Sequence, residues 1–222
     1  MEIREPLLPG NLYHLCTKAN GADLLFRDSR DYIYFKRKME ERLTEAWEIV
    51  AYTLLPEEIH LVVRIAKAEI DEETVNHSIL FGHLLNGYVQ HYNHVYVRSG
   101  SLLNRSFRRE LVKTENDLKD LITKVHNLPV ARKLVTQKHK WRFSSYREHR
   151  EQKFSLNQIA QVIAIFGDLI RYELHHFWNR LILDCILPPR KWLKILSPLE
   201  IAFREKDPLG GHRWSKRAKP PP

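Results

Sequence analysis

The residues best suited to chemistry lie in the segment 54–63, LLPEEIHLVV, where Glu58 and His60 are two positions apart. Side chains of a β-strand alternate between its two faces, so Glu58 and His60 should lie side by side. A carboxylate and an imidazole are both ligands for divalent cations, and carboxylate oxygens suit Mg²⁺ or Mn²⁺. Two readings stay open: a weak metal site completed by water, or a hydrogen-bonded pair on a polar sheet face.

The surrounding pattern indicates the elements that position this pair. Residues 59–65 read as a strand that forms a hairpin with residues 48–55 through Pro56-Glu57. A first strand over 11–18 ends at the turn Asn20-Gly21, and a capped helix follows. A helix over 71–96, expected to bury Ile79, Leu84, Tyr88, Tyr92 and Val95, and a strand over 103–112 complete the order β-α-β-β-α-β. This order predicts an α+β protein with a ferredoxin-like sheet, and His14 reaches His60 only if their strands are neighbours.

A further helix is expected after the sheet. Thr114-Glu115-Asn116-Asp117 resembles a capping box, and Leu118, Leu121, Ile122 and Val125 form the buried stripe that follows it. Lys124 lies off this stripe. Because proline disfavours helical geometry at the residue before it, the helix is expected to end near Leu128.

The chain from 151 onward has a different pattern of short capped helices. Helices are expected over 155–167 and 168–184, and a third begins at Ser197-Pro198. We therefore expect a main domain over 1–150, a small helical module over 151–207 and a flexible basic tail over 208–222.

The chain of 222 residues carries a formal charge of +9. Such a surplus of lysine and arginine favours a polyanionic partner, although a basic surface also serves solubility alone. The aromatic rings of Trp141, Phe143 and Tyr146 stand within the most basic stretch, where rings could stack on unpaired bases. The candidate nucleic-acid-binding residues are Arg105, Arg108, Arg109, Lys124, Arg132, Lys133, Lys138, Lys140, Trp141, Arg142, Arg147 and Arg150.

Cysteine content and hydropathy indicate the compartment in which the protein is expected. Cys16 and Cys185 are far apart in sequence and belong to no Cys/His cluster, so neither a disulfide framework nor a structural zinc site is expected. The sequence shows neither the pattern of a signal peptide nor an apolar run long enough to cross a membrane. We therefore expect a cytoplasmic protein without a membrane partner.

Several segments of residues 1–150 resemble the tyrosine-HUH transposases of single-stranded insertion sequences, including the REP-associated tyrosine transposases. Segment 54–63 is similar to their Met-Pro-Asn-His-hydrophobe-His-Leu motif, with His60 at the second histidine and Glu58 in place of the first. Residues 10–14, 98–107, 126–130 and 141–146 resemble further blocks of the family, including its Tyr-Ile-His-x-Asn-Pro-Val and Trp-Ser-Ser-Tyr sequences.

The resemblance implies a site in which two histidines hold a divalent cation against a phosphate and a tyrosine of a later helix attacks it. Counted back from Pro129-Val130, the tyrosine position holds Lys124 and the last metal-ligand position holds Leu128. A protonated lysine can pair with a phosphate but does not attack it.

These changes lead to a main hypothesis and an alternative. The main hypothesis is a transposase-derived protein that recognises single-stranded or hairpin DNA without strand cleavage. It needs no cofactor, beyond Mg²⁺ or Mn²⁺ at a residual Glu58/His60 site, and forms a homodimer as the family does. The alternative is an active, metal-dependent DNA-nicking transposase or nuclease that uses Glu58, His60 and either water or another tyrosine, such as Tyr92, Tyr96 or Tyr146.

Overall fold

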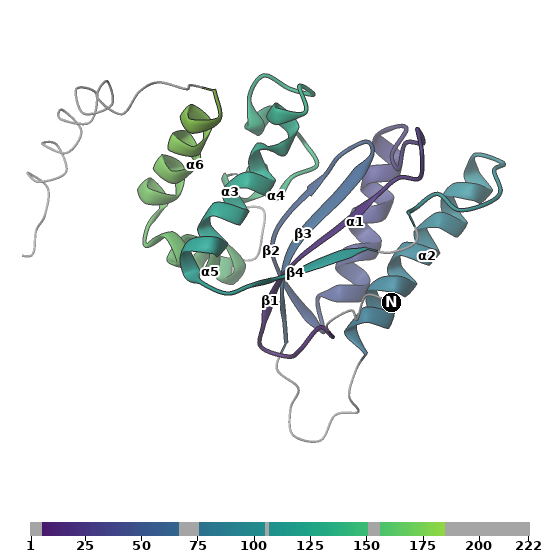
Figure 1. Ribbon diagram of the computed structural model, residues 1–222, viewed down its shortest axis with the longest axis horizontal. Helices are drawn as coiled ribbons and strands as arrows, with labels where there is room; N and C mark the ends of the chain where they lie inside the picture. The colour runs from purple at the N-terminus through teal and green to yellow at the C-terminus, as the bar shows by residue number, and fades with distance from the viewer. Residues whose placement is uncertain (1–5, 67–75, 105–106, 151–155, 185–222) are drawn as a thin grey trace, which may run out of the picture. The chain divides into compact units, whose positions relative to one another are not determined.

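A computed structural model describes residues 6–66, 76–104, 107–150 and 156–184 (Figure 1). Its four-stranded sheet has the order β2-β3-β1-β4, and every neighbouring pair of strands is antiparallel. The strands are β1 (Leu12–Lys18), β2 (Trp47–Leu54), β3 (Glu58–Ile65) and β4 (Arg108–Val112). Helices α1 (Ser29–Leu43) and α2 (His77–Val95) connect them. The predicted ferredoxin-like α+β fold is confirmed.

The alternation of β3 separates two hydrophobic cores. Ile59, Leu61 and Val63 belong to the larger core, which α1 and α2 cover, whereas Val62 belongs to a smaller core beneath α3 (Glu115–Ala131). Figure 1 shows α1 and α2 on one side of the sheet and α3 on the other. The side chains of β3 that follow the spacing of Glu58 and His60 therefore face α3.

Helix α2 and strand β4 are both shorter than their predicted ranges. α2 begins at His77, after Asn76 has capped it by accepting the N–H of Ile79 at 3.2 Å. The predicted burial of Leu84, Tyr88 and Tyr92 is confirmed, but that of Ile79 and Val95 was wrong, because these two residues lie off the buried stripe of the helix. β4 begins at Arg108, since Leu103 makes only an isolated bridge with Ala19.

Helix α3 continues past Leu128 and contains Pro129, so the predicted end at Leu128 was wrong. Proline has no N–H, which leaves the carbonyl of Val125, four residues earlier, without its helical donor. The Thr53 hydroxyl of β2 donates to this carbonyl at 2.9 Å, and Ser144 Oγ lies 3.0 Å from the same hydroxyl. A tertiary hydrogen bond thus replaces the missing helical one and allows the helix to continue.

Residues 141–146 cover the outer edge of β2 at its end. The N–H of Leu54 donates to the carbonyl of Phe143 at 2.9 Å, and the N–H of Tyr52 donates to Ser145 Oγ at 2.9 Å. The Trp141 indole donates to the carbonyl of Leu54 at 2.9 Å. The otherwise open backbone groups of an edge strand are satisfied here within the chain.

The remaining elements are a short 3₁₀ helix η1 (Lys138–Lys140), α4 (Ser145–Arg150), α5 (Leu156–Phe166) and α6 (Leu169–Asp184). By its contacts the chain divides into a unit of residues 1–180, which contains the sheet, and a unit of residues 181–222. The helix expected at Ser197 and the tail over 208–222 lie outside the described residues. In the described part of the chain, every helix is too short or too polar to cross a membrane.

A buried chain of hydrogen bonds joins α3, α4 and α6. His176 Nδ1 donates to the carbonyl of Tyr172 at 2.7 Å, so a neutral His176 must accept from His126 Nδ1 through its Nε2, at 2.8 Å. His126 Nε2 then accepts the Ser145 hydroxyl at 2.7 Å. Ser145, His126 and His176 are fully buried. A serine beside an imidazole has the composition of a nucleophile and its base, but this pair has no access for a substrate and serves the structure.

We predict that Thr53→Val destabilises the protein by about 1 to 3 kcal/mol, because the buried carbonyl of Val125 loses its donor. The double variant Thr53→Val/Pro129→Ala should recover part of this loss, since alanine restores the N–H that proline lacks. Urea denaturation of the wild type, both single variants and the double variant measures the coupling. Strictly additive effects would contradict the proposed compensation.

We also predict that acid weakens the fold between about pH 6.5 and pH 4. Burial holds the pKa of His149 at about 4 and keeps the pKa of His126 and His176 well below 6.5. Below pH 6.5 these histidines bind protons in the unfolded chain but not in the folded protein. The free energy of unfolding is therefore highest above pH 6.5, and it falls by roughly 1.4 kcal/mol per pH unit below that for each such histidine.

Denaturation midpoints measured at pH 7.5, 6 and 5 test this prediction. His149→Gln should flatten the pH dependence, whereas His139→Gln, at an exposed position of η1, should leave it unchanged. A constant free energy of unfolding across this range would rule out the buried histidines as its source.

Candidate nucleic-acid interface

Polar side chains from three strands share the sheet face that is turned toward α3. Lys18 lies opposite Glu58, and Cys16 lies between His60 on one side and Arg108 on the other. Directly opposed residues of antiparallel strands point to the same face. We call this surface the polar shelf; its members are His14, Cys16, Lys18, Glu58, His60, Arg108 and Glu110 of the sheet, with Lys124 and Arg132 of α3 and its C-terminal cap.

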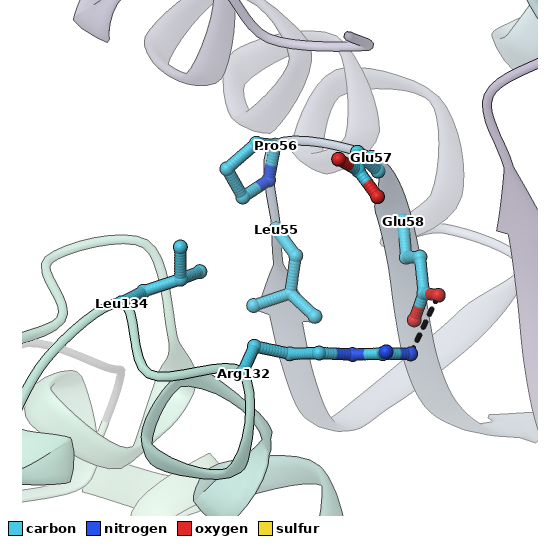
Figure 2. Close-up of a pocket in the computed structure, with 6 residues that line it drawn as sticks. All are labelled: Leu55, Pro56, Glu57, Glu58, Arg132 and Leu134. Atoms are coloured by element: carbon cyan, nitrogen blue, oxygen red, sulfur yellow. Dashed lines mark hydrogen bonds and ion pairs between the residues drawn. The ribbon is translucent and has the colours of Figure 1, made fainter. Parts of the chain in front are cut away.

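Glu58 is the centre of the shelf. Its Oε1 accepts from Lys18 Nζ at 2.7 Å and from the Arg132 guanidinium at 2.7 Å, and its Oε2 lies 2.9 Å from His60 Nε2. Figure 2 shows Arg132 reaching this carboxylate from the far side of a small pocket. Burial by itself would raise the pKa of Glu58, but the hydrogen bonds from Lys18 and His60 and the two positive charges outweigh it and lower that pKa to about 2.

The ionised carboxylate fixes the protons of two histidines. Because it only accepts hydrogen bonds, His60 Nε2 must be the donor, and burial lowers the pKa of His60 so that the ring is neutral. His60 Nδ1 then accepts from His14 Nε2 at 3.1 Å. Burial, His60 and Lys124 together lower the pKa of His14 to about 4. The condition for His14 to reach His60, that their strands are neighbours, is met by the pairing of β1 with β3.

These contacts do not fit the divalent cation that the sequence allowed at Glu58 and His60. Both carboxylate oxygens are taken by donors, and the two cations on Oε1 occupy positions from which they would repel a metal ion. His60 turns an N–H toward Glu58 and its lone pair toward His14. No group of three or more metal-ligating side chains with suitable geometry is found among the described residues. The hydrogen-bonded pair is the reading that the geometry favours.

Lys124 and Leu128 lie one helical turn apart on α3. Lys124 is exposed and lines a cavity of about 400 Å³ together with His14 and Glu110, at the opposite end of the shelf from Arg132. Leu128 is half-buried and supplies no ligand atom. The structure therefore brings Lys124 to the sheet face that holds Glu58 and His60.

The other predicted basic residues divide into exposed side chains and side chains engaged within the fold. Lys133, Lys140 and Arg142 are exposed, and Arg147 is half-buried. Arg109 follows Arg108 and so points to the opposite sheet face, where it donates to Ser78 Oγ at 2.8 Å. Lys138 donates to the carbonyl of His176 at 2.8 Å. Arg105 and the side chain of Arg150 lie outside the described residues.

The aromatic rings of 141–146 have structural contacts. Tyr146 is buried, and its ring stacks with that of Tyr172, so the expectation that it stacks on bases was wrong. Trp141 and Phe143 are half-buried and pack against Tyr32 of α1. Hydrogen bonds between the same two residues and Leu54 fix both rings beside the end of β2.

Lys18 is the shelf cation that sequence reasoning missed. The period of two places it on the same face as His14 and Cys16, and this signal was available. Its contact with Glu58 depends on the register between β1 and β3, which fixes Lys18 opposite Glu58. Spacing along one strand carries no information about that register.

Comparisons with known proteins show the fold. No protein-family model and no curated protein sequence matches the chain. Among solved structures, it is similar to a REP-associated tyrosine transposase bound to a REP hairpin, with a TM-score of 0.54 and 16% identity over 69% of this chain and 87% of that chain. At this identity the likeness shows a shared fold.

Proposed function

We propose that the chain binds single-stranded or hairpin DNA on the polar shelf and does not cleave it. The observation that carries this proposal is the convergence of four cations, Lys18, Arg108, Lys124 and Arg132, on one face of the sheet. Glu58 and Glu110 are the acids of the shelf, so cations are in excess. Such a surface gains free energy when phosphates release their counterions. The fold shared with a hairpin-bound transposase supports the same reading.

The contacts of the shelf favour binding over cleavage. Lys124 stands where the resemblance places a tyrosine. Three donors already contact the two oxygens of Glu58, and two of them are cations that would repel a metal ion. The alternative nucleophiles are engaged elsewhere. Tyr92 donates to the carbonyl of Leu24 at 2.8 Å, and the Tyr146 hydroxyl lies 2.9 Å from Glu173.

Tyr96 is a poor nucleophile for an electrostatic reason as well. Its hydroxyl donates to Asp31 at 2.9 Å, and burial with this hydrogen bond raises the pKa of Tyr96 to about 12. A raised phenol pKa means that less phenolate is present at neutral pH. Tyr96 therefore offers no ready substitute for a nucleophile at position 124.

A homodimer, as the resemblance implies, is part of this proposal. The outer edge of β2 is occupied at Tyr52 and Leu54 by residues 143–145. The outer edge of β4 pairs with no other strand among the described residues. A dimer that pairs sheets edge to edge would therefore use β4.

We predict tighter binding to a DNA hairpin and to a single strand than to a plain duplex of the same length. Fluorescence anisotropy across 50 to 400 mM NaCl should show affinity falling steeply with salt, with a log–log slope of roughly −3 if four cations contact phosphates. Absence of binding at the lowest salt, or a slope near zero, would defeat the proposed function.

We also predict that the wild-type protein neither nicks DNA nor forms a covalent adduct with it. End-labelled hairpin and single-stranded DNA, incubated with protein in Mn²⁺ and resolved on denaturing gels, should remain intact. A protein–DNA adduct would identify a tyrosine nucleophile, and nicking without an adduct would identify water. Either result would support the alternative function.

A further inference from the structure

We infer that Lys18 and Arg132 form a seat for one phosphodiester group that works without a metal ion. This inference rests on the proposed function and deepens it, because it names the groups that hold a backbone phosphate.

The geometry presents two cations side by side. Lys18 comes from the end of β1 and Arg132 from the C-terminal cap of α3, and both donate to Oε1 of Glu58 at 2.7 Å. The Glu58 side chain is 8% exposed, whereas the Lys18 and Arg132 side chains are 49% and 52% exposed. Glu58 therefore holds the charged ends from within the protein, while their other sides face solvent. A ligand meets cations that are already ordered, which lowers the entropic cost of binding them.

The charges suit a group with one negative charge. Lys18 and Arg132 carry two positive charges, and Arg108, two residue pairs away across the same face, adds a third. Glu58 and the exposed Glu57 cancel two of these three charges. A phosphodiester carries a single charge and would neutralise the remainder. A terminal phosphate, with up to two charges, would meet the carboxylates of both Glu58 and the exposed Glu57.

The adjoining pocket suits one group rather than a whole cofactor. Its volume is about 130 Å³, and its lining combines Arg132 and the two acids with apolar side chains of Leu55, Pro56 and Leu134 (Figure 2). Pockets for complete small-molecule ligands measure roughly 300–1,000 Å³. A phosphate on the cations could place the edge of its sugar against the apolar wall.

In this seat the protein's own cations hold the phosphate, as a metal ion would in a metal-dependent site. A divalent cation would have to displace Lys18 and Arg132 from Glu58 to bind there. Ions in solution would instead compete with the seat for DNA phosphates. Affinity for DNA should consequently be full in the presence of a chelator and weaker in millimolar Mg²⁺.

The first arm of the test measures the affinity of the wild-type protein for a labelled DNA hairpin in EDTA, Mg²⁺ and Mn²⁺ at constant ionic strength. Equal or tighter binding in EDTA is expected. Binding that disappears in EDTA and returns with Mn²⁺ would overturn the inference, because it would show that a metal ion and not the protein's cations holds the phosphate.

The second arm uses charge-removing and charge-keeping variants. Lys18→Gln and Arg132→Gln should each weaken binding about eightfold at 0.1 M salt and reduce the salt slope by about 0.7 to 0.9, the contribution of one neutralised phosphate. Lys18→Arg should retain both. The matched control Arg37→Gln removes one exposed charge from α1, on the other side of the sheet, and should change neither.

The outcomes separate the two proposals. Full affinity and an unchanged slope in both glutamine variants, with the wild type binding DNA, would overturn the seat alone. Failure of the wild type to bind would overturn the seat and the proposed function together. Denaturation curves show whether each variant is folded, and weak binding by Lys18→Arg as well as Lys18→Gln would contradict a role based on charge.

Discussion

The ion pairs of the buried Glu58 carboxylate determine how the sheet and α3 fit together. Glu58 is 6% exposed, and an ionised group removed from water costs several kcal/mol unless partners compensate for it. Those partners come from β1, from β3 and from the end of α3, in the form of Lys18, His60 and Arg132. Because each must arrive in one place, the charge ties the sheet register to the position of α3. Removing either cation would leave the carboxylate undercompensated, so the same contacts serve stability and the proposed binding surface.

Two side-chain cations can neutralise a phosphate, but they cannot activate a nucleophile as a metal ion does. A divalent cation polarises the phosphate and lowers the pKa of a bound water or alcohol. Lys18 and Arg132 offer hydrogen bonds and charge, and Arg132 in particular has no accessible lone pair. A surface with these groups can attract a phosphate, but the groups themselves do not supply the activation of a nucleophile that a metal ion provides. Lys124 has the same limitation, since it too can bind an anion without attacking it.

The sequence predicted local features well and long-range ones poorly. Alternation in β3, the N-terminal cap of α1 and the capping box at Thr114 are local, and the structure contains all of them. The continuation of α3 through Pro129 could not be predicted, because it depends on Thr53, which lies 72 residues from Val125. The pairing of Lys18 with Glu58 likewise depends on strand register. The burial of Tyr146 could not be predicted, because composition does not show that α6 covers this ring.

The covering of β2 by residues 141–146 has a consequence for solubility. An uncovered sheet with two open edges can add further sheets at both ends and so grow into a fibre. Here the N–H groups of Tyr52 and Leu54 are already taken by Ser145 and Phe143. At this end of β2 a further strand therefore finds no free N–H group, and growth through hydrogen-bonded strands is disfavoured there.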